Sequence, residues 1–285
     1  MGAGGGSYEP LRTVPAVEPS QVMISQRPAG ADPAVRAVAE HLPPRDDAVD
    51  AAMALLTVHH WAGLAAGIRE LRGVARRRVV VLTWDQRIFR ERFRLVRDHL
   101  PEAAAFDDRR AVPTDRLIDL LGGGRQEPVR IPHDRVDGFG AAYWRRPHAY
   151  LDSQVRAGIS MLAQTGDDAL APGLARLADD SATGRWHTRH AELLGLAAMD
   201  VGYRLIVRLC DASALGRAPP RFTGARTGSS GRGRGGWCGV GRQAPRPRSR
   251  ACRDGSPRAP LLASASPEVH KGLICTHWRV GGQGP

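Results

Sequence analysis

The chain has few of the residues on which several classes of protein depend. Its 285 residues contain only 4 cysteines, and none of these belongs to a Cys-x-x-Cys pair. A disulfide framework and a zinc site are therefore not expected, and we predict no metal ion. No apolar run approaches the roughly 20 residues of a membrane-spanning helix. The first residues do not resemble a signal peptide, so we expect a cytoplasmic protein without a membrane partner.

Acidic residues are scarce in one region only. Residues 217–285 hold 13 lysines and arginines against 2 acidic residues, whereas residues 1–216 are nearly neutral, with 28 against 27. A uniformly basic nucleic-acid-binding protein would not concentrate its charge in this way. Nucleic acid is therefore not the expected partner.

The basic region also differs from the rest of the chain in composition. It is rich in Gly, Pro, Ser and Arg and has no sustained helical or strand periodicity. We therefore expect residues 211–285 to form a low-complexity, disordered tail. Three interpretations of this tail remain open: RNA binding through its arginine–glycine run, an inert extension, or out-of-frame translation of a G+C-rich gene. Residues 1–210 are expected to form one domain.

Strand and helix patterns alternate along residues 1–210, which predicts an α/β fold with a mostly parallel sheet and helices on both faces. Residues 78–84 are the clearest strand, an apolar run typical of burial on both faces. Residues 100–127 and 165–186 have weaker patterns and are expected to form loops and short helices. The other expected strands are 13–18, 35–39, 49–56, 128–132 and 203–209, and the expected helices are 62–76, 151–164 and 187–199.

Four short segments follow one another in a fixed order near the start. They are Gly-Ala-Gly-Gly-Gly-Ser (2–7), Ala-Val-Glu-Pro-Ser (16–20), Ala-Glu-His-Leu-Pro (39–43) and Val-Asp-Ala-Ala-Met-Ala-Leu-Leu-Thr-Val-His-His-Trp (49–61). Together they resemble the cofactor-binding half of a class I S-adenosylmethionine-dependent methyltransferase, which has a Rossmann-like sheet. A nicotinamide-binding Gly-x-Gly-x-x-Gly pattern fits less well, because Ser7 replaces its third glycine and Glu18 follows too soon.

The resemblance implies S-adenosyl-L-methionine as the cofactor and an enzyme that methylates a small molecule. Gly2, Gly4 and Gly6 match the family's Gly-x-Gly-x-Gly loop, where the absence of a Cβ lets the backbone approach the cofactor. Glu18 stands where the family has an acid that accepts hydrogen bonds from both ribose hydroxyls, since a carboxylate offers two acceptor oxygens. The remaining cofactor contacts implied by the resemblance are Ala39 and Glu40 beside the adenine, and Leu55 in the fourth-strand motif.

Three histidines are candidates for contact with the methyl acceptor. The resemblance places His59 and His60 near the transferred methyl group, and His133 follows the strand expected at 128–132. An imidazole titrates near neutral pH and could orient or deprotonate an acceptor. The structural alternatives are that one of the paired histidines caps a helix while the other packs, and that His133 holds a turn.

The block 128–165 resembles the inserted cap of a bacterial branch of the family, and we expect a helical cap insertion at about 138–200. Its Tyr143 and Trp144 are expected either to line a pocket or to anchor a helix. The sequence does not indicate the acceptor, the atom methylated or the oligomeric state. A rival function of a different class is a non-catalytic protein whose Arg/Gly-rich tail binds nucleic acid.

The chain departs from the family in front of its glycines. There the family has an apolar strand, which lies at the centre of a sheet of order 3-2-1-4-5-7-6, and here Met1 occupies its place. Loss of four or five buried side chains at about 1.5–3 kcal/mol each removes about 10 kcal/mol. This is comparable with the whole stability of a typical domain, about 5–15 kcal/mol. We therefore expect the chain as written, with its first strand missing, to be unstable or inactive.

Overall fold

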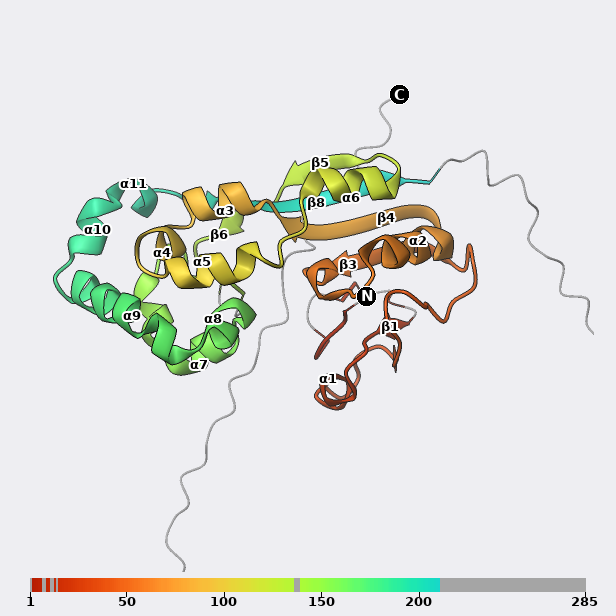
Figure 1. Ribbon diagram of the computed structural model, residues 1–285, viewed down its shortest axis with the longest axis horizontal. Coiled ribbons are helices and arrows are strands. Elements are labelled where there is room, and N and C mark those ends of the chain that lie inside the picture. The colour runs from red at the N-terminus through yellow and green to blue at the C-terminus, as the bar shows by residue number, and fades with distance from the viewer. Residues whose placement is uncertain (1, 7–8, 11–12, 14, 136–138, 211–285) are drawn as a thin grey trace, which may run out of the picture. The chain divides into compact units, whose positions relative to one another are not determined.

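The computed structural model describes residues 2–6, 9–10, 13, 15–135 and 139–210 (Figure 1). The predicted disordered tail, residues 211–285, lies outside the described residues, as do Met1 and Ser7. The description below concerns the described residues only.

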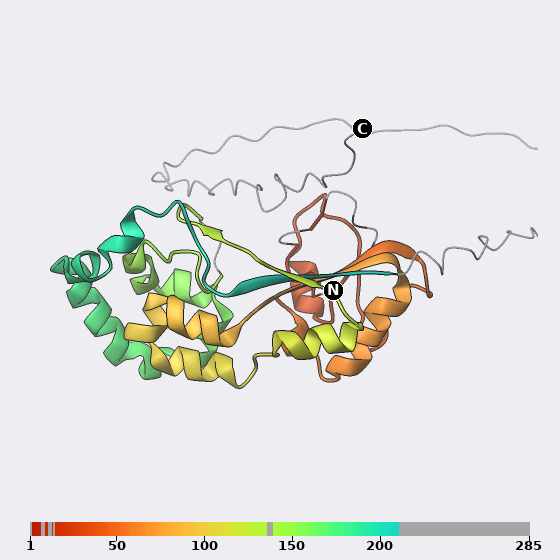
Figure 2. The ribbon, with the colours of Figure 1, turned by 90° about the horizontal axis from the view of Figure 1, so that it is seen from above.

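The predicted α/β fold is confirmed. Figures 1 and 2 show extended strands beside a group of short helices. The strands are β1 (Ala16–Val17), β2 (Ala34–Val35), β3 (Val49–Leu55), β4 (Ala75–Trp84), β5 (Arg125–Pro128), β6 (Ile131–Pro132), β7 (Ala198–Met199) and β8 (Tyr203–Leu209). The helices are α1 (Gln21–Ser25), α2 (Leu64–Val74), α3 (Gln86–Arg92), α4 (Arg94–Asp98), α5 (Pro101–Asp108), α6 (Thr114–Leu121), α7 (Ser153–Ala157), α8 (Ser160–Thr165), α9 (Asp167–Ala182), α10 (Arg185–Arg189) and α11 (Ala191–Leu194), with the 3₁₀ turns η1 (Val58–His60) and η2 (Pro147–Leu151).

The principal sheet has four strands in the order β3-β4-β8-β5. β3 and β4 are parallel, whereas β8 is antiparallel to both of its neighbours, so this sheet is mixed. β1 and β2 form a separate parallel pair, and β6 and β7 an antiparallel one. In the family order 3-2-1-4-5-7-6, the pair β2-β1 corresponds to 3-2 and the four-stranded sheet to 4-5-7-6. Within the described residues, no strand occupies the central position 1.

The glycine-rich loop lies where that central position would end. The Ala3 amide donates to the Val17 carbonyl at the end of β1, at 3.2 Å. Gly2 lies against Thr57, just after β3, so closely that a Cβ on Gly2 would be 2.1 Å from the Thr57 Oγ1. Residues 2–3 therefore contact the carboxyl end of β1 and the chain that leaves β3.

Helices α2 and α6 and alternate residues of β4 form the core of the sheet. Val79 and Val81 are fully buried, whereas Val80 and Leu82 are half-buried. β4 is thus fully buried on one face only, although its apolar run predicts burial on both. The helical partners in this core are Ile68, Leu71, Leu117 and Leu121, all fully buried.

A second core is built by the short helices that follow β4. Helices α3–α5 and α7–α11 gather at one side of the described structure (Figure 1) around buried aromatic residues, which include Phe93, Tyr150 and Trp186. None of the described helices combines the length and the apolar character needed to cross a bilayer.

The prediction of loops and short helices at 165–186 is wrong, because α9 spans 16 residues. Leu170 and Leu177, seven positions apart, are fully buried on one side of it. Its small number of strongly apolar residues and the internal Pro172 weaken the helical pattern in the sequence. The helix expected at 187–199 is instead two short helices, α10 and α11, divided at His190, whose φ of −118° is not helical. His190 is buried, with Nε2 3.1 Å from an Asp98 oxygen.

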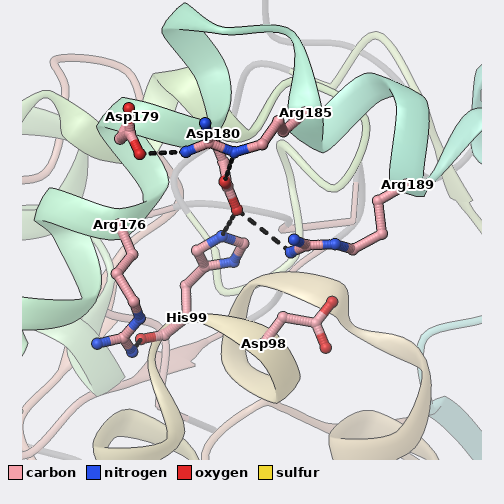
Figure 3. Close-up of a pocket in the computed structure, with 7 residues that line it drawn as sticks. All are labelled: Asp98, His99, Arg176, Asp179, Asp180, Arg185 and Arg189. Atoms are coloured by element: carbon pink, nitrogen blue, oxygen red, sulfur yellow. Dashed lines mark hydrogen bonds and ion pairs between the residues drawn. The ribbon is translucent and has the colours of Figure 1, made fainter.

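Helix α9 is held to the end of α4 through His99 (Figure 3). The buried His99 Nε2 lies 3.1 Å from the Asp180 carboxylate, and Arg176 donates to the His99 carbonyl at 3.0 Å. Gly173 allows this approach, since a Cβ there would lie 2.0 Å from the same carbonyl oxygen. The contact between α9 and α4 therefore requires glycine at this position.

Gly173→Ala should destabilise the protein by about 1–3 kcal/mol, because the added methyl group would force α9 away from a backbone oxygen. Helix propensity alone predicts the opposite change, a stabilisation of about 1 kcal/mol, because alanine favours helices over glycine. Urea unfolding measures the change. The matched control is Gly195→Ala, where φ is −83° and no atom lies within 4 Å of the added Cβ. Equal stability of the two variants would contradict the account of this contact.

Candidate functional site

Three of the four segments quoted from the sequence, at 2–7, 16–20 and 49–61, meet at one edge of the structure, where β1 and β3 end. The glycine loop contacts both ends through Val17 and Thr57. The charge of Glu18, directly after β1, also acts on the pKa of His60, directly after β3. We call this edge the strand-end site and define it by Gly2–Gly6, Glu18, Thr57–His60 and Trp84.

Glu18 fixes the glycine loop. Its side chain is nearly buried, at 6% exposure, and one carboxylate oxygen accepts the Gly4 amide at 2.8 Å while the other accepts the Ser20 amide at 2.9 Å. Each carboxylate oxygen has two lone pairs, so both keep acceptor capacity for a further donor such as a hydroxyl.

The loop backbone adopts conformations that favour glycine. Gly2, Gly4 and Gly6 have φ values of +62°, +50° and +94°, in the region that side chains with a Cβ rarely adopt. The alternate glycines and the carboxylate that holds them form a cradle open to further hydrogen bonds. This cradle fits the loop and ribose contacts expected for S-adenosylmethionine.

The other expected cofactor residues lie near the same strands, with structural contacts of their own. Glu40 accepts the Gly63 amide at 2.7 Å and so caps the start of α2. Ala39 is buried, at 4% exposure. Leu55 is the last residue of β3 and pairs with Leu82 of β4.

The two adjacent histidines lie beside the last residue of β4. The ring of His59 meets the edge of the Trp84 ring at a centroid distance of 4.7 Å, and the His59 and His60 rings are 3.8 Å apart. Burial, with His60 and the Arg110 charge adding to it, lowers the pKa of His59 to about 3. His59 is therefore neutral across the physiological range. Its Nδ1 is buried and has no hydrogen-bond partner among the described residues.

Two further residues at this edge, Asp107 and Arg110, were not among the sequence candidates. They lie at and just after the end of α5, and Arg110 donates both to the His60 Nδ1, at 2.5 Å, and to the Gln164 Oε1 of α8, at 2.6 Å. Burial, and secondarily the neighbouring Asp108, raises the pKa of Asp107 to about 6. The sequence carries no signal for them, because their importance comes from the contact between the chain after α5 and His60, which is distant in the sequence.

The structure does not bring His133 to the other candidate histidines. Its Nδ1 accepts a hydrogen bond from Arg145 at 2.7 Å, and its amide donates to the Ala197 carbonyl. No contact in the described part of the chain joins His133 to His59 or His60. Trp144 is buried and donates to the Ile131 carbonyl at 2.9 Å, the contact of an anchoring residue rather than of a pocket wall.

A hollow of about 290 Å³ lies elsewhere, beside α9 and α10 (Figure 3). At this hollow, Arg185 and Arg189 both donate to Asp180, which neutralises them, and Arg176 donates to the backbone carbonyls of Pro172 and His99. Its ion pairs hold helices together, and it contains none of the residues of the strand-end site. The lining residues are Asp98, His99, Arg176, Asp179, Asp180, Arg185 and Arg189.

Asp107→Asn should stabilise the protein at pH 7 by about 1–3 kcal/mol. A carboxyl whose folded-state pKa is about 6, raised from 3.8, binds more protons in the folded state than in the unfolded state between these values. Stability of the original chain should therefore fall as the pH rises from about 4 to about 6 and then level off, and the asparagine variant should lack this fall. Urea midpoints across this pH range measure the effect.

The matched control is Asp108→Asn. Asp108 is the next residue along, but its carboxylate pairs with Arg90 at 2.8 Å on the surface. Its removal should change stability by less than about 1 kcal/mol at pH 7. The same pH profile for both variants would contradict the assignment of the raised pKa to Asp107.

Comparisons with known proteins agree with this geometry. A family model described as a methyltransferase domain matches residues 1–83, which include the glycine loop, Glu18 and both adjacent histidines. A solved structure from Anabaena variabilis, named as a candidate methyltransferase of an antibiotic biosynthesis pathway, is 36% identical, with a TM-score of 0.63. The match covers 68% of this chain and 80% of that one.

A weaker match is a Thermotoga maritima S-adenosylmethionine-dependent methyltransferase, named as a possible histamine N-methyltransferase. It is 22% identical with a TM-score of 0.37, and the match covers 45% of this chain and 65% of that one. No curated protein sequence matches the chain. From the domain match and the Anabaena structure, the chain belongs to the class I S-adenosylmethionine-dependent methyltransferases.

Proposed function

We propose that the chain methylates a small molecule whose acceptor atom lies at the strand-end site, between the ends of β3 and β4. The observation that carries this proposal is the Glu18 carboxylate, which holds the glycine loop by the Gly4 amide at 2.8 Å. This hydrogen bond joins the glycine loop to the acid after β1, at the edge where His59, His60 and Trp84 meet.

Contacts across this edge support a small acceptor. Arg110, after α5, reaches His60 on one side and Gln164 of α8 on the other. Helices of the second core therefore extend to the site, which favours a small molecule over a polymer. In this proposal residues 1–210 form the methyltransferase domain, and residues from about 138 to 200 form its helical cap.

In the proposed mechanism, the cofactor, when bound, would supply an activated methyl group, whose bond to the sulfonium sulfur would break as a bond to an O, N or C atom of the acceptor forms in line, leaving a neutral thioether. The protein orients the partners and excludes water. Gly2, Gly4 and Gly6 would hold the cofactor by their backbone, and Glu18 would accept the ribose hydroxyls. Ala39 and Glu40 would lie near the adenine, and Leu55 beside the cofactor.

The histidines differ in the roles open to them. With a pKa of about 3, His59 is too weak a base to take a proton at neutral pH, so we assign it packing and hydrogen bonding beside Trp84. His60 is the residue of the pair that is exposed at the site. We assign no step to His133, whose contacts are with Arg145 and Ala197.

Glu18→Ala should weaken binding of S-adenosylhomocysteine at least about tenfold, because it removes an acceptor of charged hydrogen bonds worth about 1.5–3 kcal/mol. Isothermal titration calorimetry measures the change. Glu91→Ala is the control, since Glu91 is exposed on α3, away from the glycine loop. Undiminished binding by the Glu18 variant would contradict the proposed cofactor site.

We also propose that a polypeptide of this sequence binds the cofactor weakly and has little activity. The support is that β1 and β3 belong to different sheets, and that no strand among the described residues pairs with both of them. An apolar strand with a terminal acid, added before Gly2, should pair with both strands and position the loop. We expect the extended chain to bind S-adenosylhomocysteine at least about tenfold more tightly, a gain of about 1.4 kcal/mol.

A scrambled extension of the same composition, with its apolar alternation broken, controls for added length. Equal binding by the original and the extended chain would show that the central strand is not needed. Binding by neither would contradict the cofactor site as well, when the extended chain is folded by circular dichroism.

A further inference from the structure

Arg110 borders the strand-end site, and its charge has no carboxylate partner among the described residues. It donates two hydrogen bonds to neutral groups, the Nδ1 of His60 and the Oε1 of Gln164. No acidic oxygen of the described residues forms an ion pair with it. It is half-buried, and its guanidinium also lies over the Phe106 ring, 5.6 Å from the centroid.

The contact with His60 determines where the imidazole proton lies. A guanidinium has only donor groups and stays charged in proteins, so the Nδ1 that faces it at 2.5 Å must be an acceptor. In the neutral imidazole the single proton is then on Nε2. His60 thus has its lone pair turned to Arg110 and its N–H free to donate.

The surroundings of His60 keep it neutral. Partial burial of its ring and then the Arg110 charge lower its pKa, and the Glu18 carboxylate opposes them in part. His59 is also neutral, and the Arg110 charge partly offsets the rise in the pKa of Asp107 to about 6. The Arg110 charge therefore disfavours protonation of His60. Its guanidinium also occupies Nδ1, which is the only basic nitrogen of this tautomer.

We propose that Arg110 is a positioning residue of the methyl-transfer site, which fixes His60 as the Nε2–H tautomer and makes it a hydrogen-bond donor to the acceptor molecule rather than a base. The inference rests on the proposed function, because it takes the strand-end site as the place of methyl transfer. It implies an acceptor that presents a hydrogen-bond-accepting group to His60. It also implies that His60 removes no proton from the acceptor.

The test is the tautomer and pKa of His60 in Arg110→Met, from long-range ¹H–¹⁵N spectra of the imidazole nitrogens over a pH titration. The full chain and the strand-extended chain are measured in parallel, without cofactor, and backbone amide spectra report that each variant is folded. The original chain should show the Nε2–H form of His60. In Arg110→Met this preference should be lost, and the pKa of His60 should rise because a neighbouring positive charge is removed.

Arg109→Met is a close control. Arg109 lies over the same Phe106 ring, at 5.5 Å, but forms no hydrogen bond to His60 in the described part of the chain. It should leave the tautomer unchanged. Arg110→Lys is the second variant: it keeps the charge, so it should hold the pKa of His60 close to that of the original chain.

An unchanged His60 tautomer in a folded Arg110→Met variant would overturn the inference, as would an equal change in Arg109→Met. Cofactor binding separates this result from the proposed function. Tight binding of S-adenosylhomocysteine with no tautomer change would keep the methyltransferase site and reject the role of Arg110. A tautomer change in a chain that does not bind the cofactor would support the Arg110–His60 contact and reject the site.

Discussion

The hydrogen bonds of one carboxylate hold the proposed cofactor site together. Glu18 accepts the Gly4 amide and the Ser20 amide with different oxygens, so it connects the glycine loop to the end of β1. The same loop contacts Thr57 at the end of β3. Because these contacts are made by the backbone of glycines with positive φ, other residue types would strain the loop that links the two halves of the site.

The arrangement of the strands explains why this connection matters. β1 and β2 pair only with each other, and β3 begins the four-stranded sheet, with no described strand between the two groups. Hydrogen bonds along a central strand would otherwise fix the two groups in register. In the described structure the loop at residues 2–6 connects the two groups of strands through its contacts, and it does so at one end of the strands only. The proposed sites of cofactor and acceptor would thus depend on a few polar contacts rather than on a continuous sheet.

The sequence predicts the first part of this structure well, because its signals are local. The glycine spacing, the acid after β1 and the apolar strand at 78–84 reflect the conformation of nearby residues. The helical part is predicted less well. Helix α9 has few strongly apolar residues, and its position depends on Gly173 lying against the distant His99 carbonyl. Likewise, Arg110 and His60 are 50 positions apart in the sequence, and no local pattern indicates that they meet.

The most direct test of the central claim is photolabelling of the chain by S-adenosyl-L-methionine with a radioactive methyl group, followed by peptide mapping. The account predicts label in peptides that contain the glycine loop and Glu18, or residues 39–61, and competition by unlabelled S-adenosylhomocysteine. Competed label confined to the helices between residues 94 and 194 would contradict it. In that case the cofactor would bind away from the ends of β1 and β3.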